Sequence, residues 1–451
     1  MNWSDLLNND RLRPSTRPKG TDARNDFESD FGRIIFSSAM RRMHDKTQVF
    51  PLTTDDNIHS RLTHSMEVMA IGHSLGIRVS ENVDFIKRAG LDKSDLFREI
   101  PVILKNACLV HDIGNPPFGH FGETVIQNYF KKFFKSNSDF LSNDLEKEDF
   151  TLFDGNAQGF RVLTKLQILD DQYGLNLTFG TLGAYLKYPN SGRVNSELIH
   201  LKKRGVFQSE KIYLEKILDG NKLYVDKTPV RHPLCYLMEA ADSICYLVMD
   251  IEDGFNKGWY SFQNIGEYLS KIDGIKEVIE NLEKTNTGYG QEITKMVKFR
   301  IYLIQRLVDL AVSNFTNKID AIENGQYNNE LIFDDPNNLA DNLKAFCLEL
   351  VFPNREITSL ELTGHSVITG LLDYYLEFLL HDDKHYRKRA QGLISDSVLR
   401  IAFLENGLPE NSKIEGLSNY FKLRTIVDYI SGMTDQFALN HYQKISGQKI
   451  I

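Results

Sequence analysis

The chain has 451 residues, of which 41% are hydrophobic and 25% are charged. This composition is typical of a globular protein and excludes a chain that is largely disordered. The 53 basic and 61 acidic side chains give a formal net charge of −8, which excludes a strongly basic coat for nucleic acid over the whole surface.

The cysteines and the N-terminus bear on the cellular compartment. The four cysteines contain no C-x-x-C pair, so neither a disulfide framework nor a zinc knuckle is expected. The N-terminus lacks an apolar signal core, and no run of about 18 apolar residues, the length that spans a membrane, is present. We therefore expect a cytoplasmic protein with no membrane partner.

The segment from residue 11 to residue 46 is locally basic, with nine basic side chains against five acidic ones. A solvated basic arm is one interpretation, because runs of charge are usually exposed to water. The other interpretation is that some of these side chains approach a polyanion. The basic residues are Arg11, Arg13, Arg17, Lys19, Arg24, Arg33, Arg41, Arg42 and Lys46.

Apolar residues recur at helical spacing in five stretches, at 64–75, 98–112, 233–250, 296–315 and 366–380. The chain has only 12 prolines, and long periodic stretches between prolines indicate helices rather than closely spaced strands. We therefore predict a mainly α, all-α protein.

Burial is predicted for the apolar stretches 64–75, 98–112 and 233–250 as well as for 366–380, and exposure is predicted for two polar stretches. Residues 366–380 are apolar almost all round, which predicts a helix that is buried on every side. Two polar stretches, 135–151 and 324–342, are predicted to be exposed insertions or connections.

His111 and Asp112 stand at the end of one predicted helix, and Ile-Gly-Asn-Pro-Pro follows at once. Glycine and proline stop a helix at such a point. An imidazole nitrogen beside a carboxylate oxygen suits Mn, Fe, Co, Ni or Zn and can accept Mg. A lone His-Asp pair is weak support, because His44-Asp45 and His381-Asp382 are pairs as well.

Two other predicted helices offer further ligands. His64 stands at the head of 64–75, where a helix-terminal histidine with a satisfied ring is the simpler interpretation. Asp242 lies inside the apolar stretch 233–250, and a buried carboxylate is costly unless it is paired or bound to a metal. Tyr246 and Asp250 follow Asp242 at intervals of four residues, so the three side chains share one helix face.

These residues resemble the HD-domain metallophosphohydrolases. Longer strings resemble the deoxynucleoside triphosphate triphosphohydrolases of the dGTPase type, from about residue 11 to about residue 440. The resemblance implies an HD-domain helical core at 59–255, an N-terminal basic segment at 1–58 that contributes to the active site, and a C-terminal helical region at 256–451. The strings are RIIFSSAMRRMHDKTQVFPL (33–52), RLTHSMEV (61–68), HDIGNPPFGHFGE (111–123), FDGNAQGFR (153–161) and DYISGMTDQFA (428–438).

The resemblance also implies roles at the reacting phosphate. One divalent metal ion (Mg, Mn, Co, Fe, Ni or Zn) is expected beside the α-phosphate, and the family's catalytic histidine and its acidic partner fall on His120 and Glu123. If a helix begins near Gly119, these two residues share its face at i and i+3. The implied metal ligands are His64, His111, Asp112 and Asp242.

Roles in substrate binding are implied in the same way. The residues expected to contact the sugar are Gln48, Tyr246 and Asp250, and those expected to contact the phosphates are Arg61, Lys187 and Tyr188. Asn156 falls in a family motif without an assigned contact. In the closing string an arginine is expected where Gln436 stands, so an anion contact there is in doubt.

The expected activity is hydrolysis of dGTP or other dNTPs to the deoxynucleoside and tripolyphosphate. No G-x-x-x-x-G-K-[ST] or G-x-G-x-x-G motif occurs, so side chains and metal must bind the phosphates. The alternatives are another HD-type phosphohydrolase, such as a nucleotidase, and a non-catalytic regulator that binds nucleotide or DNA. Family members commonly form homo-oligomers, and a nucleotide effector or single-stranded DNA is a further candidate partner.

Overall fold

The computed structural model describes residues 1–14, 22–52, 58–167, 171–272, 274–284 and 291–449. Helices dominate the structure, and the sheet within these residues is a hairpin of two short antiparallel strands, β1 (Tyr224–Val225) and β2 (Thr228–Pro229). This confirms the predicted all-α class. Across the described residues we find no helix whose length and apolar character would let it cross a membrane. Arg17 and Lys19 of the basic segment lie outside the described residues.

The helices of the first half of the chain are α1 (Trp3–Leu6), α2 (Asp26–Ile35), α3 (Ser38–Arg42), α4 (Arg61–Glu81), α5 (Val83–Ala89), α6 (Lys93–Val110), α7 (Gly119–Ser136), α8 (Asp144–Thr151), α9 (Gly155–Arg161), α10 (Phe179–Tyr185), α11 (Lys211–Gly220) and α12 (Pro233–Asn256). Those of the second half are α13 (Phe262–Leu269), α14 (Ile275–Lys284), α15 (Gln291–Asn317), α16 (Ile319–Glu323), α17 (Leu339–Phe346), α18 (Arg355–Leu379), α19 (Lys384–Gln391), α20 (Asp396–Glu405), α21 (Asn419–Ser431) and α22 (Asp435–Ile445). Short 3-10 helices span Met43–Asp45, Gln208–Glu210 and Ile414–Gly416, and π-helical turns span Val162–Leu166 and Cys347–Val351.

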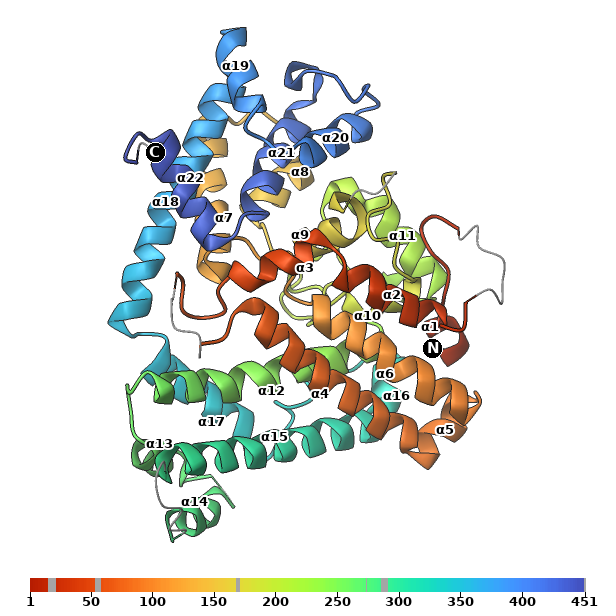
Figure 1. The fold of residues 1–451 in the computed structure, drawn as a ribbon. Helices are drawn as coiled ribbons and strands as arrows, with labels where there is room; N and C mark the ends of the chain where they lie inside the picture. The colour runs from red at the N-terminus through yellow and green to blue at the C-terminus, as the bar shows by residue number, and fades with distance from the viewer. Residues whose placement is uncertain (15–21, 53–57, 168–170, 273, 285–290, 450–451) are drawn as a thin grey trace.

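Two large hydrophobic clusters hold these helices together. In the first cluster α12 packs against α4 and α15, and α4 packs against α6 (Figure 1). In the second cluster α7 and α8 pack with α18 and with the last helices of the chain. The expected domain boundaries at residues 58 and 255 stay predictions.

The helices predicted from apolar spacing are confirmed as α4, α6, α12, α15 and α18. Local signals explain where they begin. Ser60 closes a capping box at the start of α4, and Pro233 occupies the first turn of α12, where its missing N–H costs nothing. α6 ends at Val110, two residues earlier than a helix through Asp112 would require: His111 caps it and Asp112 lies in the turn that follows.

The prediction that 366–380 is buried on every side is wrong. Along α18 the residues Val367, Leu371 and Leu379 are buried, whereas Asp373 and Glu377 are exposed. The apolar stripe of α18 packs on the second cluster, and the polar residues of the opposite face stay in water.

The prediction that the two polar stretches are exposed holds in that most of their residues are at least partly exposed, but each stretch also has a few buried residues. In 135–151, Phe150 is fully buried and the Asp149 carboxylate accepts a hydrogen bond of 2.6 Å from the hydroxyl of Tyr420. In 324–342, Leu331 and Leu339 lie in the first cluster. A few apolar residues in each stretch anchor it, although the stretch as a whole is polar.

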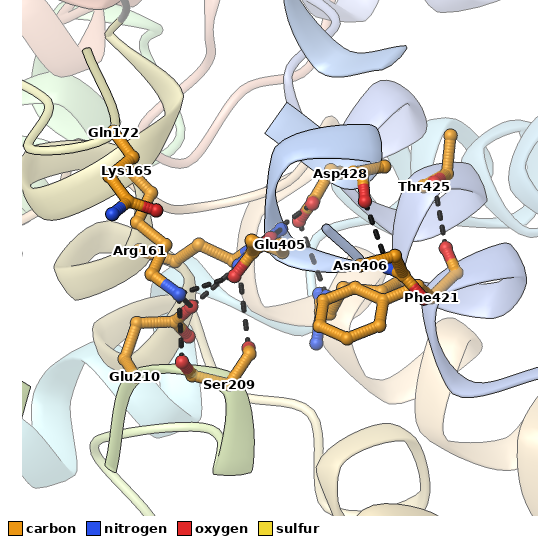
Figure 2. A network of polar contacts seen from close by, with 12 residues as sticks. Arg161, Lys165, Gln172, Ser209, Glu210, Glu405, Asn406, Phe421, Thr425 and Asp428 are labelled. Atoms are coloured by element: carbon orange, nitrogen blue, oxygen red, sulfur yellow. Dashed lines mark hydrogen bonds and ion pairs between the residues drawn. The ribbon is translucent and has the colours of Figure 1, made fainter. Parts of the chain in front are cut away.

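A buried network of ion pairs joins α9 to the C-terminal helices (Figure 2). The Arg161 guanidinium lies 2.7 Å from Glu405 Oε2 on α20 and 2.8 Å from Asp428 Oδ2 on α21. It also lies 2.5 Å from Glu210 Oε1, and Lys165 pairs with Glu405 as well. Because all these groups are removed from water, each depends on its partners for compensation of its charge.

We expect the replacement Arg161→Met to lower the free energy of unfolding by about 3–5 kcal/mol, because it leaves buried carboxylates uncompensated. The matched control is Arg400→Met, which breaks an ion pair with Glu410 at the surface, where the loss should stay below about 1 kcal/mol. Denaturant unfolding of both variants measures the difference. Equal losses in the two variants would show that the network contributes no more than a surface pair.

Candidate functional site

Ten of the twelve predicted site residues line one cavity of about 510 Å³. It lies where the end of α6, the start of α7 and the middle of α12 meet, and residues from α18 close one side. The two predicted residues that are not part of the lining, His64 and Glu123, contact lining residues. The ten lining residues are Gln48, Arg61, His111, Asp112, His120, Lys187, Tyr188, Asp242, Tyr246 and Asp250.

The four predicted metal ligands converge from three helices. Asp242 Oδ1 lies 3.2 Å from His64 Nε2 and 3.3 Å from His111 Nε2. Ligand atoms of His64, His111 and Asp112 lie within 4.8 Å of one another, so these side chains could hold a metal ion. Residues 178 positions apart in sequence thus meet at one point.

The hydrogen bonds of His111 fit a metal ligand. Its Nδ1–H donates to the carbonyl of Cys108 at 2.7 Å, so Nε2 is the atom that carries the lone pair when the ring is neutral. Nε2 is buried and accepts no hydrogen bond from any described residue. A buried lone pair of this kind is costly unless a cation binds it. Asn115 supports the neighbouring ligand by donating to Asp112 Oδ1 at 2.7 Å.

The charges around the four residues favour a cation. Burial alone would lower the pKa of His111, but the carboxylates of Asp112 and Asp242 outweigh it and raise this pKa to about 9. Burial would raise the pKa of Asp112, yet the positive charges of Arg61 and His111 lower it to about 2. Both carboxylates are therefore ionised at neutral pH, and their field attracts a proton or a metal ion to the imidazoles.

His120 and Glu123 form a hydrogen-bonded pair on the first turn of α7, which begins at Gly119 as the sequence indicated. His120 Nδ1–H donates to Glu123 Oε2 at 2.9 Å, and Glu123 Oε1 accepts from the backbone N–H of Gly155 at 2.7 Å. The charge of Glu123 and this hydrogen bond raise the pKa of His120. The His120 side chain is 76% exposed and the Glu123 side chain only 7% exposed. A shielded carboxylate therefore orients an accessible imidazole.

Two glycines let backbone and side chains approach the metal ligands. Gly119 has φ +57°, and a Cβ there would lie 2.5 Å from Nη2 of Arg61, the residue that pairs with Asp112. A Cβ on Gly114 would lie 1.9 Å from the backbone nitrogen of Gly159 on α9. Only glycine allows these contacts, which place the loop after Asp112 against α9.

Basic side chains surround another part of the cavity, and most of them are paired. Lys187 Nζ lies 3.1 Å from Glu239 Oε1, and Arg231 binds the same carboxylate at 2.8 Å. Lys203 also lines the cavity and lies 2.7 Å from Asp154 Oδ2. The sequence analysis missed Lys203, although the basic run at 202–204 was a signal for it.

The stripe predicted on α12 lies along the cavity wall. Tyr246 is half-buried, and burial together with the charge of Asp253 raises the pKa of Asp250 well above its usual range. Asn156 lines the cavity too. Gln436 is exposed, donates to Asn440 Oδ1 at 3.2 Å and does not line the cavity.

Comparison with known proteins identifies the family. Residues 61–152 match the HD domain, and residues 334–444 match the phosphohydrolase-associated domain. The chain is 37% identical to the deoxyguanosinetriphosphate triphosphohydrolase-like protein of Listeria monocytogenes, over 99% of this chain and 100% of that protein. It is 34% identical to the protein of the same name from Synechocystis sp., over 99% of both, and 32% identical to the deoxyguanosinetriphosphate triphosphohydrolase of Enterobacter sp., over 93% of both. The resemblance found in the sequence is thus confirmed, and the chain belongs to the deoxyguanosinetriphosphate triphosphohydrolase-like family of HD-domain hydrolases.

Proposed function

We propose that the protein is a metal-dependent triphosphohydrolase that converts dGTP or other dNTPs to the deoxynucleoside and tripolyphosphate. The observation that carries this proposal is the single cavity in which the His-Asp ligand set, His120 and several basic side chains meet. Relatives named as hydrolases of deoxyguanosine triphosphate support it.

In this proposal His64, His111, Asp112 and Asp242 hold one divalent metal ion. When bound, the ion neutralises negative charge on the phosphate and makes the phosphorus easier to attack. Its identity among Mg, Mn, Co, Fe, Ni and Zn is open, because imidazole and carboxylate ligands accept all of them.

The basic residues of the cavity then bind the phosphate chain. A nucleoside triphosphate carries about four negative charges, and cationic side chains neutralise such charge through short, charge-assisted hydrogen bonds. Arg61 lies beside Asp112, while Lys187 and the neighbouring Tyr188 lie on the other wall. Lys187 must exchange part of its contact with Glu239 for the substrate.

His120 donates the proton that the leaving 5′-oxygen needs. Its Nδ1 is occupied by Glu123, so Nε2 is the atom that carries the transferable proton. The charge of Glu123 raises the pKa of His120, which favours the protonated imidazole that a general acid needs. Glu123 fixes the ring and stabilises its charge.

The sugar is recognised by Gln48, Tyr246 and Asp250. The Tyr246 ring lies on the cavity wall between Asp242 and Asp250 along α12, where it would leave no room for a 2′-hydroxyl. Gln48 and Asp250 then bond the 3′-hydroxyl. Homo-oligomer formation, a nucleotide effector and single-stranded DNA binding stay predictions.

A panel of dGTP, dATP, dCTP, dTTP, GTP and dGMP with Mg²⁺, Mn²⁺ or Co²⁺ tests the activity. We expect tripolyphosphate and nucleoside in equal amounts from at least one dNTP, and a higher kcat/KM for dGTP than for GTP because a steric wall rejects the extra hydroxyl. Tyr246→Ala should lower the ratio of kcat/KM for dGTP over GTP, because the smaller side chain leaves room for the 2′-hydroxyl. Turnover of dGMP alone would favour a nucleotidase, and no turnover with any metal would favour a non-catalytic regulator.

Metal content tests the ligand set without reference to activity. Asp242→Ala removes a carboxylate oxygen that lies near both imidazoles, so bound metal measured by elemental analysis should fall to background while helicity by circular dichroism is kept. Asp382→Ala is the matched control, since Asp382 belongs to another His-Asp pair and is exposed. Undiminished metal in Asp242→Ala would show that the ligands are assigned wrongly.

The His120→Ala variant tests the general acid. Loss of one general acid typically lowers the rate by about 10²–10⁴-fold, so kcat should fall by that order with metal content and KM near normal. In the unmutated protein kcat should also fall as pH rises through the raised pKa of His120, because the protonated ring is the acid. This fall of kcat at alkaline pH, the alkaline limb of the pH profile, should be absent from His120→Ala.

The exposed His44, which pairs with Asp45, supplies the control His44→Ala. A His120→Ala enzyme within about threefold of normal kcat would be far short of the general-acid range and would exclude the role. An unchanged alkaline limb in that variant would exclude it as well.

A further inference from the structure

We infer that Asp435, on the first turn of α22, is a positioning residue. It fixes the position of two segments of the cavity wall, at Thr47 and at Phe118, relative to each other. It does not line the cavity. The inference rests on the proposed function, because the walls that it joins carry Gln48 and His120.

The Asp435 carboxylate is buried and binds two segments that are remote in sequence. Oδ1 accepts a hydrogen bond of 3.0 Å from the backbone N–H of Phe118. Oδ2 accepts one of 3.0 Å from the backbone N–H of Thr47, and the Thr47 hydroxyl donates to the same oxygen. With 2% of its surface exposed, the residue depends on these three donors to compensate its charge.

Both segments continue directly into proposed substrate contacts. Thr47 lines the cavity and precedes Gln48. Phe118 precedes Gly119 and His120, with which α7 begins. One carboxylate therefore determines the distance between the proposed sugar-binding residue and the proposed general acid.

The backbone of Phe118 shows that this point is under constraint. Its φ of +62° is the left-handed conformation, which is unfavourable for a bulky residue. Such a conformation persists only where surrounding contacts impose it. The hydrogen bond to Asp435 is one such contact, and it sets the direction in which the chain enters α7.

A second set of bonds joins the same three parts of the chain. The Lys46 ammonium donates to the carbonyl of Asn115 at 2.5 Å and to the carbonyl of Ser431 at 2.8 Å. Residues 46–47, 115–118 and 431–435 thus form one junction. A purely structural role for Asp435, in which it only attaches the C-terminal helices, is the competing explanation, and the two roles differ in their effect on turnover.

The variant Asp435→Asn keeps the size of the side chain but replaces one acceptor oxygen with an NH₂ group, which cannot accept from Thr47. Because a misplacement of about 1 Å can cost about 100-fold in rate, we expect kcat for the best dNTP to fall about 10- to 100-fold. The ratio of kcat/KM for dGTP over GTP should narrow, and metal content should stay normal. Amide hydrogen exchange should become faster in residues 46–50 and 117–123.

The pair Thr47→Val and Thr47→Ser makes the test independent of the folding of Asp435→Asn. Valine removes the hydroxyl that binds Asp435 and should lower the ratio of kcat/KM for dGTP over GTP. Serine keeps the hydroxyl, so this ratio should stay near that of the unmutated protein. Gln436→Ala is the control at the adjacent exposed position, and it should leave kcat and the exchange rates unchanged.

Asp435→Asn could lower the melting temperature and leave kcat, the ratio of kcat/KM for dGTP over GTP and the exchange rates unchanged. That result would overturn the inference and leave Asp435 a structural role only. Loss of metal together with activity would overturn it too. If the unmutated protein hydrolyses no dNTP, the proposed function fails. The exchange rates then decide by themselves whether Asp435 holds the two segments.

Discussion

The pairing of largely buried charged side chains is the constraint on which the centre of this structure depends. Asp242 is placed in the apolar helix α12 and finds two imidazoles within 3.3 Å, and Asp112 pairs with Arg61. Charges of this kind are tolerated in a core only when geometry and partners compensate the lost hydration. The pairs that make a metal site chemically reasonable are therefore also the pairs that make the fold possible.

The same constraint links the C-terminal helices to the cavity along two routes. On one route Asp428 binds Arg161 at the end of α9, and Gly155 at the start of α9 donates to Glu123. On the other route Asp435 binds the backbone of Phe118 at the start of α7. Both routes end at the pair of Glu123 and His120. The region matched by the phosphohydrolase-associated domain is thus bonded directly to the elements that carry the candidate site.

Local pattern in the sequence was sufficient for much of the fold, whereas most of the candidate site residues were implied by the resemblance to the family. Apolar spacing predicted α12 and the shared face of Asp242, Tyr246 and Asp250, because both depend only on helical geometry. Burial of Phe150 within 135–151 could not be predicted, since Phe150 packs in the second cluster, against Tyr420 of α21 among others. Asp435 was missed for the same reason: its partners lie more than 300 positions away, so its place in the string 428–438 gave no sign of what it contacts.

In the proposed function, the unequal exposure of His120 and Glu123 would let one histidine serve as an acid in successive turnovers. A general acid that has donated its proton must regain it before the next substrate reacts. The ring is 76% exposed, so water can return the proton directly and no buried relay is required. Glu123 is shielded and held by Gly155, so its charge stays close to the ring and favours reprotonation without entering the reaction itself. Rigidity in the carboxylate and access for the imidazole are two separate requirements, and placing them three residues apart on the first turn of α7 satisfies both.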